Sequence, residues 1–233
     1  ICHGAVYQSP MVLHGVTESV VENVRVTGNW YVGMLMDGWN PAGPSALLVS
    51  KCVFRNCYAE SIQNRGFYLY GNTADCVFDT CFASGGSGVT DYGFNFNAAN
   101  TGSANSQFRT KVIGCSADKC GFQGFGLGDA AVYCVFIGNS ASNISNAAGV
   151  GFLCITANSQ TPQYNTYNDN IASACAGQGF LFSGTLYSGG DGNKAIACGV
   201  GCLINASAGV QSQYISMSNF QTISSTTIGV EVA

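Results

Sequence analysis

The chain has 233 residues, of which 31 are glycine and only 9% are charged, and its formal net charge is −4. This acidic balance argues against nucleic acid as the main partner, because phosphate recognition needs clustered Lys and Arg. Aromatic residues make up 12% of the chain, which argues against intrinsic disorder. No apolar run reaches the roughly 18 residues of a membrane span, so we expect none.

Residues 1–22 precede the regular pattern of the chain. Residues 1–10 show no periodicity, and residues 11–16 resemble an incomplete first copy of the pattern that follows. His14 titrates near neutral pH and could serve as a base, although a partly exposed histidine at the edge of the fold is the simpler interpretation. The chain has only two histidines, so we expect no metal site, and nothing in the sequence calls for a cofactor.

From residue 33 onward the chain repeats one short segment, in which a glycine is followed by a large apolar residue and an alternating apolar stretch. The opening glycines lie between 22 and 33 residues apart, a spacing typical of solenoids. Alternation with period two indicates strands rather than helices. The eight copies begin at Gly33, Gly66, Gly93, Gly124, Gly151, Gly179, Gly201 and Gly229.

A second short strand runs in step with the first, as in residues 52–57 and 76–81. A single coil cannot bury its inward face, but a stack of coils can. We therefore expect residues 23–233 to form an all-β, parallel β-helix of about eight coils. Because the pattern runs to both ends, we expect the chain to be a fragment of a longer protein.

Allowing a shift of one residue, the position after the second strand is Asn or Cys in every copy. A stacked Asn at a turn can bond the turn backbone and the amide of its neighbour, which satisfies polar groups inside the coil. Cys fits the same position as a small buried residue. The predicted ladder consists of Asn29, Cys57, Cys81, Cys115, Asn139, Asn170, Cys198 and Asn219.

The twelve cysteines could form disulfides in a secreted protein. Most of them fall at inward strand or ladder positions. Stacked neighbours such as Cys57 and Cys81 would point the same way, which is poor disulfide geometry. We therefore favour buried free thiols and keep disulfides as the alternative.

The coil repeat and the interior ladder resemble the right-handed parallel β-helix superfamily of pectate lyases, and within it phage tailspikes and capsule depolymerases. The resemblance covers about residues 20–233. It implies a bacterial polysaccharide as partner, a homotrimer, and a location in a virion tail or outside the cell. The catalytic signatures of pectate lyases, galacturonases and mannuronan epimerases are absent from the sequence, and a fold alone does not fix activity.

Residues 38–45, 56–65, 83–91 and 97–107 form longer connections. Insertions of this kind gather on one face of a solenoid and often bind ligands there. Aromatic rings could contact sugar rings while polar neighbours bond the hydroxyls; the alternative is that the rings only cover the outer sheet. The candidate substrate-binding residues are Trp39, Arg65, Tyr68, Tyr70, Tyr92, Asn95 and Asn97.

The candidate catalytic residues are Asp37, Glu60 and Asp91. Glycoside hydrolysis needs two carboxylates about 5 to 10 Å apart, and a lyase needs a base. Alignment of the coils predicts that all three share one groove with Arg65. The simpler interpretation of each is a solvated turn residue or a surface ion pair.

Strand alternation turns the second residue after each glycine outward. In the later coils this row and the next outward row are aliphatic, and they predict an apolar oligomer interface at Leu153, Ile155, Leu181 and Leu203. Apolar patches usually mark interfaces, and a trimer of identical chains would cover this one. Cover by a loop of the same chain or by a missing segment is the alternative.

The sequence supports three functional hypotheses. The first is a tailspike-like receptor-binding protein that binds, and in one version depolymerises, a bacterial surface polysaccharide. The second is a secreted polysaccharide lyase or epimerase that works as a monomer. The third is a structural fibre or adhesin segment without activity.

Overall fold

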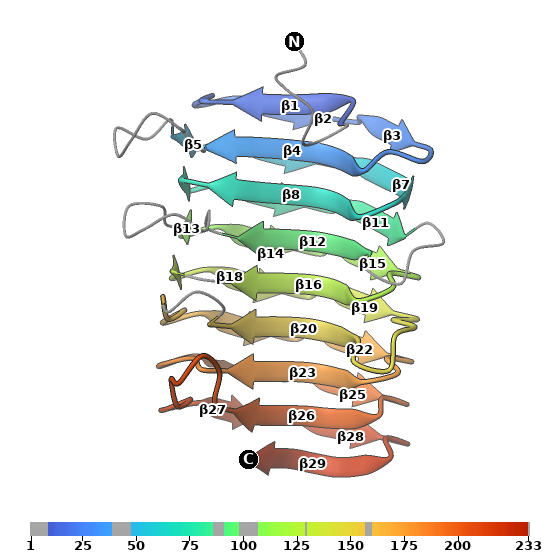
Figure 1. Ribbon diagram of the computed structural model, residues 1–233, viewed down its shortest axis with the longest axis vertical. Coiled ribbons are helices and arrows are strands. Elements are labelled where there is room, and N and C mark those ends of the chain that lie inside the picture. Colours follow the sequence, from blue (N-terminus) through green and yellow to red (C-terminus); the bar gives the residue numbers. More distant parts are fainter. Residues whose placement is uncertain are drawn as a thin grey trace.

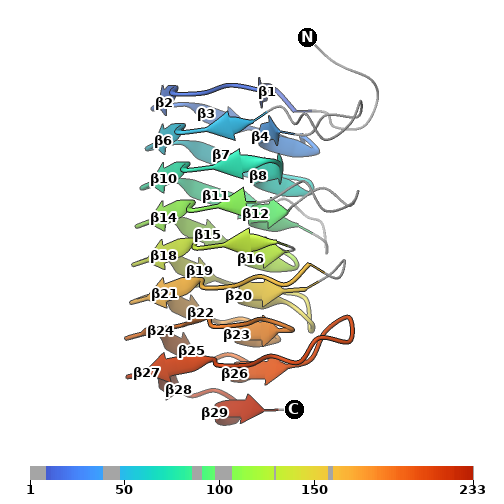
Figure 2. The same ribbon diagram turned by 90° about the vertical axis from the view of Figure 1, so that its left-hand side faces the viewer.

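The computed structural model describes residues 9–38, 48–85, 91–97, 107–128, 130–156 and 160–232. The strands pair in parallel and stack into a right-handed parallel β-helix, as expected from the repeats (Figure 1). Turned by 90°, the solenoid shows the strands of one sheet along one side and those of another along the opposite side (Figure 2). The described residues form no helix that could cross a membrane.

Sheet A is the longest sheet and contains the glycine-led segments of the sequence. Its nine strands are parallel, and each pairs with its equivalent in the next coil. In stacking order they are β1 (Met11–His14), β4 (Val32–Gly38), β8 (Arg65–Gly71), β12 (Tyr92–Asn97), β16 (Gln123–Gly128), β20 (Val150–Ile155), β23 (Gln178–Ser183), β26 (Val200–Asn205) and β29 (Thr227–Val232).

Sheet C has eight strands and contains the second repeated segment. They are β2 (Val20–Glu22), β6 (Val53–Arg55), β10 (Val77–Asp79), β14 (Lys111–Ile113), β18 (Val135–Ile137), β21 (Thr166–Asn168), β24 (Gly189–Asp191) and β27 (Ser216–Ser218). Both β1 and β2 pair with the following coil, so the stack already begins within residues 9–22.

Sheet D follows sheet C in every coil and also has eight strands. They are β3 (Arg25–Thr27), β7 (Tyr58–Ile62), β11 (Phe82–Gly85), β15 (Ser116–Asp118), β19 (Ser140–Ser142), β22 (Ile171–Ser173), β25 (Lys194–Ile196) and β28 (Gln221–Ile223). A four-stranded sheet B bridges sheets A and C with β5 (Val49–Ser50), β9 (Thr73–Ala74), β13 (Gln107–Phe108) and β17 (Ala131–Val132).

Tight corners join these sheets. Most corners turn at one residue of positive φ, and the next residue points inward; Asn56 (φ 51°) before Cys57 is an example. A single left-handed residue redirects the chain without a loop, and Asn or Gly adopts that conformation at low cost. Short corners between the sheets therefore give each coil a compact cross-section.

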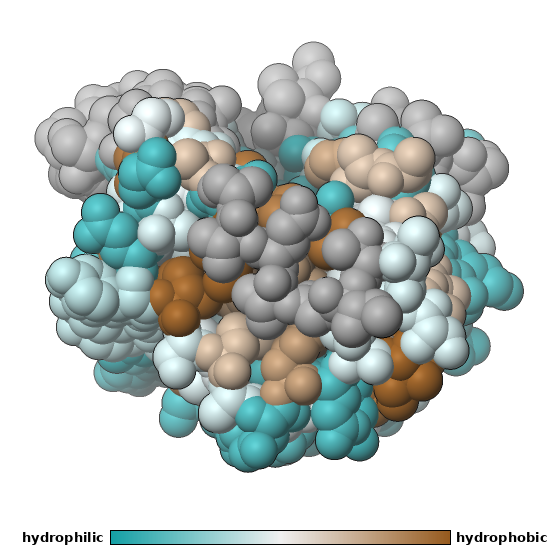
Figure 3. Space-filling view, turned by 90° about the horizontal axis from the view of Figure 1, so that it is seen from below, coloured by the Kyte–Doolittle hydropathy of each residue, from teal (hydrophilic) through white to brown (hydrophobic). Residues whose placement is uncertain are grey.

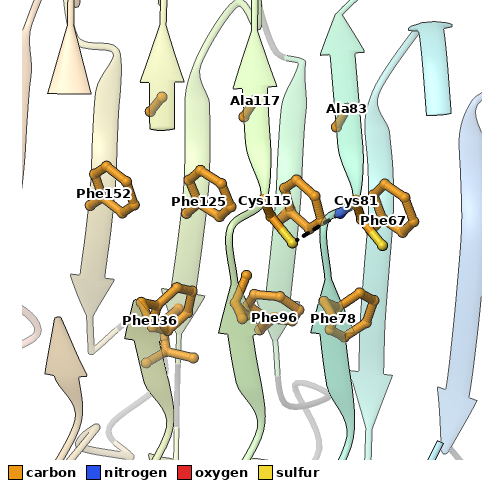
Figure 4. Packing of buried hydrophobic residues seen from close by; sticks show 14 of the residues in the cluster. Phe67, Phe78, Cys81, Ala83, Phe96, Cys115, Ala117, Phe125, Phe136 and Phe152 are labelled. Atoms are coloured by element: carbon orange, nitrogen blue, oxygen red, sulfur yellow. Dashed lines mark hydrogen bonds between the residues drawn. The ribbon is translucent and has the colours of Figure 1, made fainter. Parts of the chain in front are cut away.

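Stacked aromatic rings fill the interior (Figure 4). The residue after the glycine of sheet A points inward, as the alternation predicted, and forms a column whose neighbouring ring centroids lie 4.7 to 4.9 Å apart. These rings are at most 1% exposed, so they stabilise the fold by burial and by stacking. The column consists of Phe67, Phe94, Phe125, Phe152 and Phe180.

The repeated glycine has a steric cause. A Cβ on Gly124 would lie 2.6 Å from the Cβ of Ala141 in sheet D and 2.7 Å from the backbone oxygen of Gly151. Five other sheet A glycines face an alanine of sheet D at a similar distance. The glycine–alanine pairs let sheets A and D approach closely where they meet, which explains the sequence repeat.

The interior ladder lies at the corner between sheets C and D. Asn139, Asn170 and Asn193 form a continuous chain of amide hydrogen bonds of 2.9 to 3.0 Å. The amide oxygen of Asn139 also accepts a hydrogen bond from the backbone N–H of Cys115 at 2.9 Å. The backbone N–H of Cys81 in turn donates to the sulfur of Cys115 at 3.3 Å. The predicted ladder is therefore confirmed from Cys57 to Asn170.

Two members of the predicted ladder were wrong, and a third is one residue out of step, as the alignment allowed. Asn29 is an exposed turn residue, and Asn219 is the positive-φ residue just before the inward position. Cys198 belongs to the next corner, between β25 and β26. Asn193 takes its place in the ladder. The two corners of a coil carry similar residues, so the sequence alone aligned them one corner or one residue out of step.

The eleven described cysteines are free and buried, in agreement with the expectation of inward thiols. Burial raises the pKa of the Cys134 and Cys154 thiols to about 12. These side chains therefore act as small apolar residues of the core.

Candidate functional site

A groove with a volume of about 300 Å³ lies on the outer face of sheet A. Its lining comes from β8, β12, β16, β20 and β23. Parallel strands lie about 4.8 Å apart, so five of them span roughly 19 Å along the solenoid axis. The groove is therefore an elongated surface feature rather than a closed cavity.

Missing side chains create the hollow. In one outward row Gly126 stands between Asn95 and Leu153 in register, and in the next row Gly128 is in register with Ile155. A Cβ on Gly126 would lie 2.0 Å from the Oε1 atom of Gln123. The side chain of Gln123 therefore lies over Gly126, and its position in the groove needs glycine there.

Arg65 lies at the N-terminal end of the groove. Its guanidinium carbon is 4.4 Å from the ring centre of Tyr68 and 5.1 Å from that of Tyr92, a cation–π arrangement. Its Nε donates to Oδ1 of Asn95 at 3.2 Å, and its Nη1 donates to Oδ1 of Asn64. These contacts fix a half-buried cation at one end of the lining.

Two amide oxygens in the middle of the groove have no hydrogen-bond partner among the described residues. They are Oε1 of Gln123, a residue only 5% exposed, and Oδ1 of Asn97. A buried acceptor without a donor costs free energy. Both oxygens are covered in the structure, so a ligand hydroxyl or N–H supplies the donor once these amides turn toward the groove.

The C-terminal end of the groove is aliphatic. Leu153, Ile155 and Leu181 line it, and Leu153 is only 6% exposed. Three of the four predicted interface residues thus belong to the groove, while Leu203 is half-buried and outside its lining. Seen from the C-terminal end, hydrophobic side chains form separate patches between hydrophilic ones (Figure 3).

The structure brings together four of the predicted substrate-binding residues. Arg65, Tyr92, Asn95 and Asn97 line the groove. Tyr68 supports Arg65 and is 2% exposed, so it offers little ring surface to a ligand. Tyr70 is half-buried and its ring lies 5.3 Å from that of Tyr68; Trp39 lies outside the described residues.

The three candidate carboxylates do not come together. Asp37 lies at the end of β4, in the register row of Tyr70, with Oδ2 3.3 Å from Nδ1 of His14. Asp91 precedes β12, at the opposite end of the strands and roughly 20 Å from that row at about 3.3 Å per residue. Glu60 is on sheet D, 3.4 Å from Arg25. The coil alignment predicted one shared groove because it could not place these residues on their sheets.

A tyrosine ladder, missed at the level of the sequence, runs along the corner before sheet C. Its rings stack with centroids 4.7 to 5.1 Å apart and interplanar angles of 2 to 9°. Every member has positive φ, and the residues are 41 to 68% exposed. The ladder consists of Tyr133, Tyr164, Tyr187 and Tyr214. Their coil-length spacing was a signal that could have revealed it.

Gln123, Gly126 and Gly128 were also missed as groove residues. The signal was present in the run of alternating glycines at 124, 126 and 128, because a strand without outward side chains leaves a depression. Among the described residues, no cluster of three or more His, Cys, Asp or Glu could hold a metal ion.

The fold and the groove together define a class: a parallel β-helix with an elongated groove across its longest sheet. No family model and no curated protein matches the chain in sequence. Among solved structures it is similar to PfbA, a surface adhesin of Streptococcus pneumoniae, with 12% identity and a TM-score of 0.64. The alignment covers 96% of this chain and 59% of that chain, so this chain spans less than two thirds of PfbA's length.

A second structure of the same pneumococcal surface protein aligns with 8% identity over 94% of this chain and 82% of that chain. Its TM-score of 0.35 is too low to bear on the fold. At 12% identity, the first similarity establishes the parallel β-helix fold and nothing further.

Proposed function

We propose that this chain is a tailspike-like receptor-binding segment that holds a bacterial surface polysaccharide in the groove of sheet A. The observation that carries the proposal is a pair of buried amide acceptors in an elongated open groove, on Gln123 and Asn97, for which the described part of the chain supplies no donor. Sugars present rows of hydroxyl donors, which match such acceptors. The roughly 19 Å reach of five strands suits a segment of a polymer better than a small metabolite.

Binding, rather than cleavage, is the activity that the site supports. Hydrolysis needs a carboxylate pair about 5 to 10 Å apart, and the predicted carboxylates Asp37, Glu60 and Asp91 lie on different sheets or at opposite strand ends. No carboxylate lines the groove among the described residues. The lyase or epimerase hypothesis has no observation in its favour.

The fold supports a place on a surface. PfbA, which is described as a surface adhesin, shares it, and we propose that this chain is likewise displayed outside the cell or on a virion tail. Assembly as a homotrimer stays a prediction. The outward leucines of sheet A support a trimer interface less strongly than the sequence suggested, because the single chain already covers much of Leu153.

The experiment compares two asparagines of one register row. Asn97→Leu removes the unpartnered acceptor inside the groove, while Asn205→Leu changes the equivalent residue of β26, outside the lining. Both proteins are applied to an array of bacterial capsular polysaccharides and lipopolysaccharide glycans, and hits are measured by calorimetry. We expect the unaltered chain and Asn205→Leu to bind equally and Asn97→Leu to bind about tenfold more weakly. An array on which the unaltered chain retains no glycan would refute the proposal.

A further inference from the structure

We infer that the groove selects an acidic glycan and that Arg65 binds its carboxylate; this inference rests on the proposed function. The chain has four arginines. Three of them are exposed and pair with a carboxylate, whereas Arg65 is half-buried and has no carboxylate within ion-pair distance among the described residues. The pairs are Arg25–Glu60 at 3.4 Å, Arg55–Glu22 at 2.6 Å and Arg109–Asp75 at 2.6 Å.

The surroundings of Arg65 hold the cation without neutralising it. A guanidinium has five N–H donors, and the structure engages two of them, on Nε and Nη1, with the neutral amides of Asn95 and Asn64. The rings of Tyr68 and Tyr92 fix its plane. Removing a charge from water without a counter-ion is costly. The remaining donors suit the two oxygens of a carboxylate, which arginine binds in a bidentate manner.

The rest of the lining orients the ligand. From Arg65 the groove passes to the acceptors of Asn97 and Gln123, then to the aliphatic side chains of Leu153 and Ile155. A sugar carboxylate therefore lies at the β8 end, hydroxyl or amide donors lie over the glycine floor, and apolar sugar faces or acyl methyl groups lie over β20. This order of groups fits an acidic polysaccharide with apolar substituents better than a neutral one.

The test alters the ligand and the protein in parallel. Acidic capsular polysaccharides retained on the array are compared with their carboxyl-reduced forms, in which each carboxylate has become a hydroxymethyl group. Each form is titrated by calorimetry into the unaltered chain, Arg65→Gln, Arg65→Lys and the control Arg55→Gln. Arg55 lies on sheet C, away from the groove, and keeps the control matched in chemistry.

We expect carboxyl reduction to weaken binding to the unaltered chain and to Arg55→Gln by about tenfold or more, the usual value of a charged hydrogen bond. Arg65→Gln should bind both forms equally at the weaker level, and Arg65→Lys should fall between, because it keeps the charge but loses the planar fork. Thermal melting followed by circular dichroism verifies that each variant is folded. If Arg65→Gln does not fold, the comparison of the two ligand forms on the unaltered chain and Arg65→Lys decides the question.

Two results would overturn the inference in different ways. Equal binding of the acidic and reduced forms by the unaltered chain, or retention of neutral glycans only, removes the role of the carboxylate and leaves the proposed function intact. Retention of no glycan at all removes both.

Discussion

Two glycines of β16 have opposite structural roles, so the same substitution in each should give opposite results. Gly124 faces sheet D, and a Cβ there would lie 2.6 Å from the Cβ of Ala141 and 2.7 Å from the backbone oxygen of Gly151. Neither neighbour is a flexible side-chain end that can swing away. Overpacking of this kind costs about 1 to 3 kcal/mol, and we expect Gly124→Ala to lose about 3 kcal/mol of unfolding free energy.

Gly126 faces the groove. Its added Cβ would meet only the end of the Gln123 side chain at 2.0 Å, with the Nδ2 of Asn95 next at 3.3 Å. Gln123 can rotate away, and alanine lowers the entropy of the unfolded chain, which favours folding by about 0.4 to 1 kcal/mol where the backbone permits it. We expect Gly126→Ala to change stability by less than about 1 kcal/mol. The new methyl group and the displaced amide should nevertheless fill the groove floor and weaken glycan binding by about tenfold or more.

Urea unfolding followed by circular dichroism measures the free energy of unfolding, and calorimetry with an array-selected glycan measures the binding affinity. Gly124→Ala, where it folds, should keep its affinity for the glycan. The reasoning fails if Gly126→Ala destabilises the chain as much as Gly124→Ala does, because the groove floor would then belong to the core. It also fails if Gly126→Ala binds glycan normally.

Two further predictions concern the interior. Asn170→Leu deprives the backbone N–H of Asn139 and the backbone oxygen of Phe136 of their partners, and it should lower the free energy of unfolding by about 3 kcal/mol. The control Asn168→Leu, on the outer face of the preceding strand, should lower it by less than about 1 kcal/mol. Equal urea midpoints for the two variants would contradict the ladder. Burial raises the pKa of the Cys134 and Cys154 thiols from 9.0 to about 12. Their contribution to the free energy of unfolding is fully present below pH 9 and is lost as pH rises toward 12, by about 1.4 kcal/mol per thiol at pH 10. The urea midpoint should therefore fall above pH 9; a midpoint that stays constant between pH 9 and pH 10 would count against this burial.

The fold could be predicted from the sequence because its physical causes are local and repeated. Period-two alternation identifies strands, and the recurring glycine marks the place where sheets A and D approach each other. The inward phenylalanines follow directly from the alternation. The ladder could be predicted only in part, because two corners of each coil carry similar residues and only the three-dimensional register separates Cys198 from Asn193.

The candidate site was harder to predict, because it depends on glycines that lack side chains and on the sheet to which each residue belongs. Arg65, Tyr92, Asn95 and Asn97 were predicted, since strand alternation places polar side chains outward. Gly126 was not predicted as part of the groove, because a glycine has no side-chain group that indicates a binding role. Glu60 was placed in the groove because coil alignment gives the height of a residue along the axis but not the sheet to which it belongs.

The single-residue corners have a consequence for how such a solenoid can diversify. Each coil stacks on its neighbours in the same way, so gain or loss of one coil changes the length of the solenoid and not its cross-section. A duplicated coil between β16 and β20 would lengthen the groove by about 4.8 Å and would leave Arg65 at one end and Leu181 at the other. Unequal recombination between repeats would then adjust the length of the groove without a change at either of its ends.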